Sequence, residues 1–141
     1  HRSYYAYTIS VDLDRVGIDG EINVSNEEKA KRVKTLLETV QYLYRDIRGR
    51  RENLSPLFII GGNYERKNPF FENIVKIDNN MINVNALAEM KESNEDLEKS
   101  TIVGVTSGIF NNDSQIKEKL GAVTIAEAFG EFKKKVDEYY A

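Results

Sequence analysis

The clearest pattern of apolar and polar positions lies between residues 25 and 47. Ser25 and Glu28 fit a capping box, in which each side chain binds a backbone amide at the start of a helix. Apolar residues then recur at spacings of three and four, as on one side of a helix with a period of 3.6; they are Val33, Leu36, Leu37, Val40, Leu43, Tyr44 and Ile47. The pattern predicts a helix that begins after Ser25, buries this side, and ends near Gly49.

A short apolar run follows at residues 57–60, directly after Pro56. Its length suits a strand better than a helix, and its lack of alternation predicts a strand that is buried on both faces. Together with the preceding helix and turn, this strand resembles part of a βαβ unit.

Residues 5–13 alternate between apolar and more polar side chains. The odd positions hold Tyr5, Tyr7, Ile9, Val11 and Leu13. A period of two is typical of a strand with one buried and one wetter face. We therefore expect the first strand of the fold here.

The second half of the chain predicts a hairpin, a strand and two helices. Asp78, Asn79 and Asn80 tolerate left-handed backbone and separate two short apolar runs. The expected elements are hairpin arms at 73–77 and 81–84, a short helix at 86–91, an exposed acidic connection at 92–98, a core strand at 101–106, and a helix from Thr124 towards Tyr140. The apolar stripe of this last helix is interpreted as core packing.

The order strand, helix, strand, hairpin, strand, helix indicates the α+β class. A ferredoxin-like or RNA-recognition-motif-like sandwich fits this order best, with helices on one face of one antiparallel sheet. Such a sheet can leave its other face open for single-stranded RNA.

Composition narrows the functional classes. The chain has 141 residues, which predicts a single domain over 1–141. It has no cysteine, which excludes disulfides, thiolate zinc sites and a cysteine nucleophile, and its sole histidine is His1, which weighs against histidine triads and imidazole metal sites. No apolar run approaches the roughly 20 residues that span a bilayer. We expect a cytoplasmic protein without a cofactor and without membrane contact.

Positive charge is concentrated between Lys29 and Arg51. This window holds eight basic and two acidic side chains, a surplus of six positive charges in a chain whose net charge is −3. Lysines near a helix start oppose the helix dipole, at a cost of roughly 0.3–1 kcal/mol each, which favours an anion at this surface. The alternative interpretation is an ordinary solvated helix face.

A second basic pair, Arg66 and Lys67, follows Gly61 and Gly62 in a polar loop. The spacing lacks the glycine-lysine-serine/threonine ending of a Walker loop, so we exclude nucleotide hydrolysis of that type. Two interpretations of the loop stay open: it contacts a nucleic-acid backbone, or it is an ordinary connection.

Asp12 and Asp14 lie on one face of the first predicted strand. Two carboxylates could share a cation, and a metal-dependent nuclease would rest on this pair alone. Solvation at the strand end, or pairing with Arg15, is the alternative.

Several short motifs occur in an order and spacing that resemble those of CRISPR-associated backbone subunits of the DevR type. They are Tyr-Ala-Tyr-Thr-Ile-Ser-Val-Asp-Leu-Asp-Arg-Val-Gly at 5–17, Lys-Ala-Lys-Arg-Val at 29–33, Tyr-Arg-Asp-Ile-Arg-Gly-Arg-Arg at 44–51, Leu-Ser-Pro-Leu-Phe at 54–58, and Asn-Pro-Phe at 68–70. The resemblance covers residues 5–71. It implies a type I Cascade complex, with subtype I-B favoured.

The resemblance implies an RNA-recognition-like core without a catalytic centre. The implied partners are guide RNA, other CRISPR-associated subunits and copies of the chain itself. About half of the family's usual length would precede His1, so this chain would be a C-terminal fragment, in agreement with its abrupt start without methionine.

Carried over by position, the resemblance places the RNA contacts at Arg45, Arg48, Arg50 and Arg51, with Gly49 allowing close approach. Guanidinium groups match phosphate oxygens in geometry. Arg66 and Lys67 are further candidates. Helix C-terminal partners and surface salt bridges would also account for Arg45 and Arg48. The alternative function is an oligomerising ferredoxin-like regulatory or small-molecule-binding domain that does not bind nucleic acid.

Overall fold

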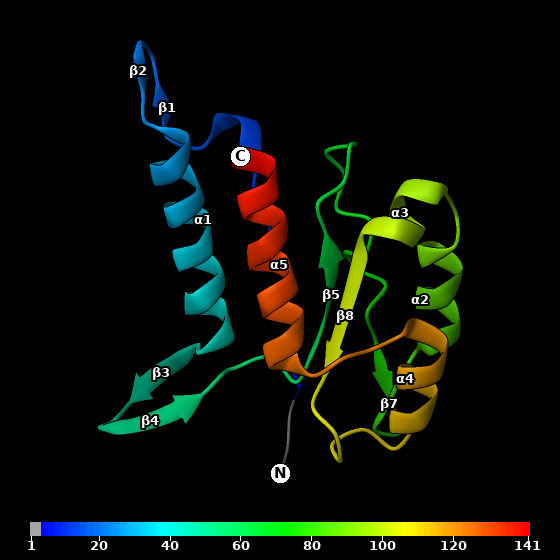
Figure 1. The fold of residues 1–141 in the computed structure, drawn as a ribbon. Coiled ribbons are helices and arrows are strands. Elements are labelled where there is room, and N and C mark those ends of the chain that lie inside the picture. The colour runs from blue at the N-terminus through cyan, green and yellow to red at the C-terminus, as the bar shows by residue number, and fades with distance from the viewer. Residues whose placement is uncertain (1–3) are drawn as a thin grey trace.

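The computed structural model describes residues 4–141 and confirms the α+β class (Figure 1). In chain order the elements are η1 Leu13–Arg15, β1 Ile18–Asp19, β2 Ile22–Asn23, α1 Asn26–Gln41, β3 Tyr44–Ile47, β4 Arg50–Asn53, β5 Phe58–Gly62, β6 Ile77–Asp78, β7 Met81–Ile82, α2 Val84–Lys91, α3 Glu95–Ser100, β8 Thr101–Val105, α4 Asp113–Leu120 and α5 Ile125–Tyr140. No described helix is both long and apolar enough to cross a bilayer.

The strands do not join into the single sheet that a ferredoxin-like sandwich requires. Over residues 4–141 they form four two-stranded sheets, β1–β2, β3–β4, β5–β8 and β6–β7, each antiparallel. The expected βαβ unit is also absent from this part of the chain, because β5 pairs only with β8 and the pairing is antiparallel.

The β5–β8 pair lies at the centre of the main core, with helices on both faces (Figure 1). Val103 and Val105 face a buried cluster that includes Leu87 of α2, Leu97 of α3 and Ile116 of α4. On the opposite face, a Cβ added at Gly104 would lie 2.7 Å from the Cβ of Ala128 in α5. The prediction of helices on one face, with the other face open for RNA, is therefore wrong for this sheet.

Helices α1 and α5 pack side by side in a smaller second cluster. Its buried members are Ala30, Val33, Val136 and Tyr140. Two ion pairs cross between the helices, Lys34 Nζ to Asp137 Oδ1 at 2.9 Å and Lys133 Nζ to Glu38 Oε1 at 3.5 Å. Because α1 has no other large partner, much of its surface is exposed.

The start of α1 is confirmed and its end is not. Ser25 Oγ accepts a hydrogen bond from the Glu28 amide at 3.1 Å, as a helix cap requires. The Glu28 carboxylate accepts from Arg32 Nε at 3.2 Å. Among the hydrogen bonds of the described residues, none runs from the Ser25 amide to Glu28, so the reciprocal half of the capping box is not seen. The helix ends at Gln41. Residues 44–53, which we call the arginine hairpin, then form β3 and β4.

A two-residue turn connects the two strands of the arginine hairpin. Arg48 and Gly49 have φ values of 51° and 77°, and positive φ at both central positions defines the type I′ turn that best connects two antiparallel strands. Gly49 thus belongs to a hairpin turn and does not end a helix. The predicted burial of Tyr44 is wrong, because its side chain lies on the exposed hairpin.

The strand predicted at residues 5–13 is absent. Residues 4–12 form no helix or strand, and η1 begins at Leu13. Tyr5, Tyr7 and Ile9 are exposed. Alternation supplies the propensity of a strand, but a strand also needs a hydrogen-bonded neighbour, and none pairs with this segment among the described residues.

The other elements mostly agree with the sequence pattern. The hairpin β6–β7, the helices α2 and α5 and the buried strand β8 are confirmed, with Asn79 and Asn80 at positive φ in the hairpin turn. The strand at 57–60 appears as β5, but its residues are half-buried and not buried on both faces as expected. The acidic connection forms α3 at its end, and α4 was not predicted.

Candidate nucleic-acid interface

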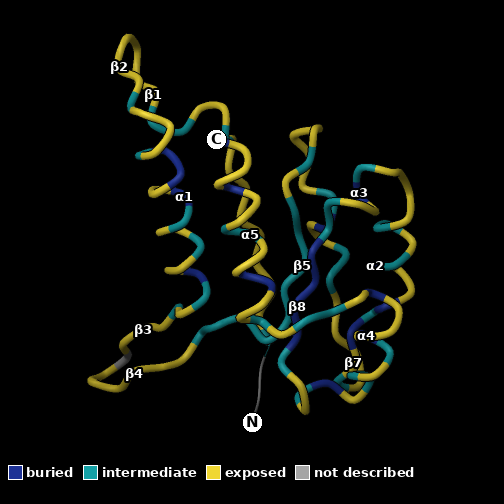
Figure 2. Tube along the Cα trace, viewed as in Figure 1, coloured by how far each residue is buried: buried dark blue, intermediate teal, exposed yellow. Residues whose placement is uncertain are grey.

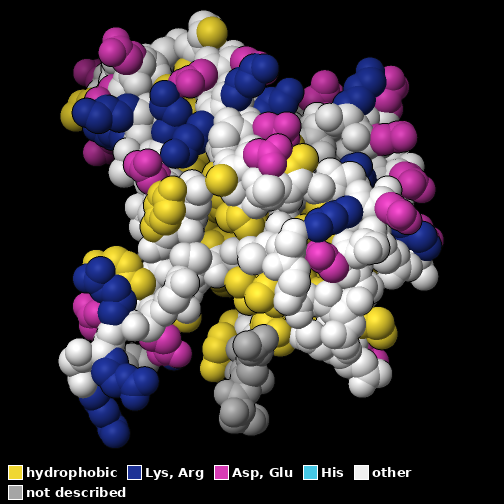
Figure 3. Space-filling model, turned by 60° about the horizontal axis from the view of Figure 1, so that its bottom comes forward, with side chains coloured by type: hydrophobic (Ala, Val, Ile, Leu, Met, Phe, Trp, Pro, Cys, Tyr) yellow, Lys and Arg dark blue, Asp and Glu magenta, His cyan; other side chains and the backbone are white. Residues whose placement is uncertain are grey.

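The arginine hairpin projects from the end of α1, away from both buried clusters (Figure 1). Its β3 residues 44–46 and the whole of β4 are exposed. Figure 2 shows this contrast, with β8 largely buried and the hairpin in the colour of exposed residues. In Figure 3 the hairpin is the projecting arm on which blue Lys and Arg side chains lie beside magenta carboxylates. Of the charged groups on residues 44–53, four are arginines and two are carboxylates.

The strand register decides which arginines are paired. Arg45 lies opposite Glu52, and Arg45 Nε donates to Glu52 Oε2 at 2.9 Å. This contact raises the pKa of the Arg45 guanidinium. Arg51 lies opposite Asp46, with 3.8 Å between Nε and Oδ1, and its Cζ lies 4.1 Å from the centroid of the Tyr44 ring. These cross-strand contacts hold the two strands together.

Arg48 and Arg50 differ from the other two arginines. Within residues 4–141 neither side chain has a hydrogen bond or ion pair, and both are exposed at the hairpin tip. Their charges are therefore available to an external anion. Arg45 and Arg51 are thus paired with carboxylates, whereas the charges of Arg48 and Arg50 at the hairpin tip are uncompensated.

Arg48 occupies a backbone position that arginine rarely takes. Its φ of 51° lies in the left-handed region, where glycine, asparagine and aspartate are favoured. A residue held there costs of order 1–3 kcal/mol, and such positions cluster at functional sites. Gly49 beside it has open space around its Cα, so another molecule can approach the backbone here.

Arg66 and Lys67 lie elsewhere, in the loop after β5 at the opposite end of the molecule from the hairpin (Figure 1). Lys67 Nζ donates to both Asp14 carboxylate oxygens at 2.9 Å, and Asp12 Oδ2 lies 3.9 Å away. This ammonium lowers the pKa of Asp14. Asp12 and Asp14, which were considered as ligands for a cation, therefore surround the Lys67 ammonium group. Asp14 pairs with Lys67 and not with Arg15.

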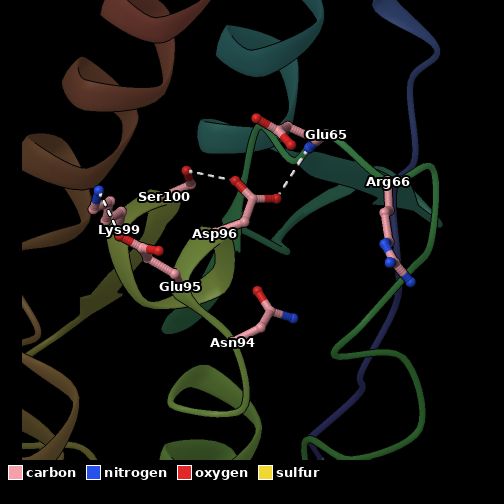
Figure 4. Close-up of a pocket in the computed structure, with 7 residues that line it drawn as sticks. All are labelled: Glu65, Arg66, Asn94, Glu95, Asp96, Lys99 and Ser100. Carbon is pink, nitrogen blue, oxygen red and sulfur yellow. Dashed lines mark hydrogen bonds and ion pairs between the residues drawn. The ribbon is translucent and has the colours of Figure 1, made fainter.

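Arg66 lines a polar hollow of about 660 Å³ with residues of α3 (Figure 4). Asp96 accepts hydrogen bonds there from the Glu65 amide at 3.1 Å and from Ser100 Oγ at 3.3 Å. Lys99 pairs with Glu95 at 3.0 Å. The lining has three carboxylates and two cations, so it does not extend the basic surface of the hairpin.

The basic residues of α1 also do not continue that surface. Arg32 and Lys34 are paired with Glu28 and Asp137. Lys29 is only 9% exposed. Lys31 is exposed, but it lies in the first half of α1, away from the hairpin. The surplus charge between residues 29 and 51 is thus divided between a helix whose basic side chains are mostly paired or buried and a hairpin with two unpaired arginines.

Two aromatic residues at the base of the hairpin are not evident from the sequence pattern. Tyr42 and Tyr44 were assigned to no site, and Tyr44 was placed on a buried helix face, yet both rings are exposed. Tyr44, Arg45, Asp46 and Ile47 run apolar, polar, polar, apolar, a spacing that fits a helix, so the pattern held no signal for an exposed strand here.

A family model described as the CRISPR-associated negative auto-regulator DevR/Csa2 matches residues 1–86. The match covers more than half of the chain and includes the whole arginine hairpin. No curated protein and no solved structure matches the chain.

Proposed function

Because the chain belongs to the CRISPR-associated DevR/Csa2 family, we propose that it is a non-catalytic subunit that binds guide RNA in the backbone of a type I Cascade complex. In this proposal the chain works in the cytoplasm beside other CRISPR-associated subunits and copies of itself. It holds the guide, and base pairing by the guide reads the target.

The observation that carries the proposal is the pair of uncompensated guanidinium groups at the tip of the arginine hairpin. Arg48 and Arg50 are exposed, and neither has a partner within the described part of the chain. Phosphate oxygens match the donors of a guanidinium fork. Contacts to phosphate position a protein on RNA without reading sequence, as a subunit that must accept any guide requires.

The other candidate residues take different roles in the proposal. Arg45 and Arg51 hold the hairpin rigid through Glu52, Asp46 and Tyr44, and they add to the positive field around the tip. Arg66 and Lys67 lie too far from the hairpin to share one phosphate group with it, so they would contact a separate part of the RNA. Lys67 would first have to leave Asp14.

Exposed apolar side chains favour the protein partners. Tyr5, Tyr7, Ile9 and Val11 project from extended backbone that pairs with no described strand. Extended segments of this kind add readily to the edge of a neighbouring sheet. A neighbouring subunit in the complex would supply that edge.

The test is RNA binding by the chain and by its Arg48→Ala/Arg50→Ala variant. Fluorescence anisotropy with a labelled single strand of about 12 nucleotides measures the dissociation constant. We expect the variant to bind about tenfold more weakly or worse, because charge-assisted hydrogen bonds to phosphate are lost. The matched control is Lys76→Ala/Lys119→Ala, which removes the same charge from exposed residues of the other half of the molecule.

Equal loss in both variants would mean that net charge alone drives binding, and the hairpin assignment would be wrong. If the wild-type chain binds no RNA, purifies without excess absorbance at 260 nm and instead self-associates, the oligomerising regulatory or small-molecule-binding domain becomes the better account.

A further inference from the structure

Two exposed tyrosines line a hollow where α1 meets the arginine hairpin. The hollow has a volume of about 390 Å³ and is lined by the last turns of α1 and the start of β3. Tyr42, the C-cap residue of α1, is 63% exposed, and Tyr44, the first residue of β3, is 49% exposed. Neither ring contributes to a buried cluster. Their exposure therefore needs an explanation other than core packing.

The geometry points to Tyr42 and Tyr44 as a stacking platform for the unpaired bases of a single-stranded RNA whose phosphates lie on Arg48 and Arg50. This inference rests on the proposed function and adds to it the class of RNA that the site accepts. In a duplex the base faces are covered by their neighbours, whereas a single strand can place them on aromatic rings. Every base has a π face, so such a platform tolerates any guide sequence.

The ring of Tyr44 is already held in place for this role. The Arg51 guanidinium lies 4.1 Å from the ring centroid, and the same guanidinium is 3.8 Å from Asp46 across the hairpin. An aromatic ring and a guanidinium plane are both surfaces on which bases stack. The cross-strand contacts thus fix the ring on the scaffold that also carries the unpaired arginines.

The charge of the neighbouring hairpin tip, and not that of the hollow's own lining, favours RNA over a protein partner. Glu38 is the only carboxylate in its lining, and Lys133 lies 3.5 Å from that carboxylate. The strand that continues from Tyr44 leads directly to the uncompensated Arg48 and Arg50. Aromatic rings beside free guanidinium groups are the combination that proteins use for single-stranded nucleic acids.

The experiment compares three variants with the wild type by fluorescence anisotropy. The Tyr42→Leu/Tyr44→Leu variant removes both rings and keeps apolar side chains, Tyr42→Phe/Tyr44→Phe keeps both rings, and Tyr139→Leu removes an exposed ring at the far end of α5. Each is tested with single-stranded RNA and with an abasic strand of the same length. Stacking on aromatic rings predicts at least about fivefold weaker RNA binding by the leucine variant. The phenylalanine and Tyr139 variants should bind as the wild type does.

The abasic strand separates stacking from an indirect effect. It offers phosphates without bases, so the wild type and the leucine variant should bind it equally. If the leucine variant also loses affinity for the abasic strand, the rings act by positioning the hairpin and the inference is wrong. If the leucine variant binds RNA as the wild type does while Arg48→Ala/Arg50→Ala loses affinity, the inference fails and the proposed function stands. If none of the variants changes binding, both fail.

Discussion

Strand β8 and the arginine hairpin both consist of short strands, but β8 lies in the core and the hairpin lies on the surface. Helices cover β8 on both faces, and its residues 102–105 are buried. The hairpin has water on both faces and is held by Arg45–Glu52 and by Arg51 stacked on Tyr44. Burial of apolar area is the main source of stability, so β8 stabilises the fold. Exposed charges contribute little to stability and are free to bind.

Stability and binding are therefore separable in this molecule. A change in the core should unfold the chain, and a change in the hairpin should leave it folded. The stability of the core is tested by changes outside the hairpin, and the binding role of the hairpin by changes at Arg48 and Arg50.

The first prediction compares two leucines. Leu97 of α3 is 1% exposed and Leu36 of α1 is 38% exposed. Leu97→Ala should lower the free energy of unfolding by about 2–5 kcal/mol, because it removes buried methyl groups and leaves a cavity. Leu36→Ala should change it by less than about 0.5 kcal/mol. Chemical denaturation measures both, and similar losses in the two variants would mean that the cluster packed against β8 is no more tightly packed than the exposed side of α1.

The second prediction concerns Gly104, where β8 meets α5. A Cβ there would lie 2.7 Å from the Ala128 Cβ and 3.1 Å from Ile59 Cγ2. Gly104→Ala should therefore destabilise the fold by about 1–3 kcal/mol, through overpacking. Gly61→Ala is the control, because a Cβ on that β5 residue would meet no atom within 4 Å. Denaturation midpoints that shift equally in both variants would contradict the close packing of α5 on β8.

The third prediction is a loss of stability in alkaline solution. Burial raises the pKa of Tyr64 from 10.0 to about 12, and its hydroxyl is 2.8 Å from Thr101 Oγ1. The folded state therefore holds this proton more tightly than the unfolded state. Its contribution to stability is complete below pH 10 and is lost as the pH rises towards about 12.

Chemical denaturation across this pH range checks the alkaline prediction. Tyr64→Phe should make the pH dependence shallower without abolishing it, because burial also raises the pKa of Tyr7 and Tyr140. An unchanged dependence in Tyr64→Phe would show that Tyr64 is not the group responsible.

The smallest effect is expected at the exposed pair of Lys67 and Asp14. The hydrogen bond from Lys67 lowers the pKa of Asp14 below 3.8. The pair's contribution to stability is present above that value and is lost as the pH falls through the folded-state pKa; it is small because water screens the pair. Lys67→Met should return the Asp14 pKa towards 3.8, as measured by carboxyl titration with NMR. An Asp14 pKa that stays low in this variant would assign the shift to another group.

The sequence pattern predicted elements whose signals are local. The cap at Ser25, the turn at Asn79 and Asn80, and the apolar stripe of α5 each lie within one element, and each is confirmed. The prediction of an N-terminal strand is wrong for a different reason. Its alternation is real, but whether it pairs depends on a neighbouring strand that its own residues do not specify.

The candidate site could be predicted only in part, because only some of its features depend on neighbouring residues in the sequence. Adjacent arginines at 45–51 necessarily lie close together, so the basic cluster could be read from the sequence. The register that pairs Arg45 and Arg51 and leaves Arg48 and Arg50 free depends on a hairpin turn that was interpreted as a helix end. The distance from the hairpin to Arg66 and Lys67 depends on the tertiary fold, which no local pattern encodes.

The salt dependence of RNA affinity in the wild type and in Arg48→Ala/Arg50→Ala shows whether the two arginines at the hairpin tip bind phosphate groups. Each phosphate contact on a single strand adds about 0.7 to the slope of log affinity against log salt. If both arginines hold phosphates, the variant's slope should be shallower by about 1.4, with the free energy of unfolding unchanged within about 0.5 kcal/mol. Equal slopes in the two proteins would contradict the claim that the hairpin tip binds RNA.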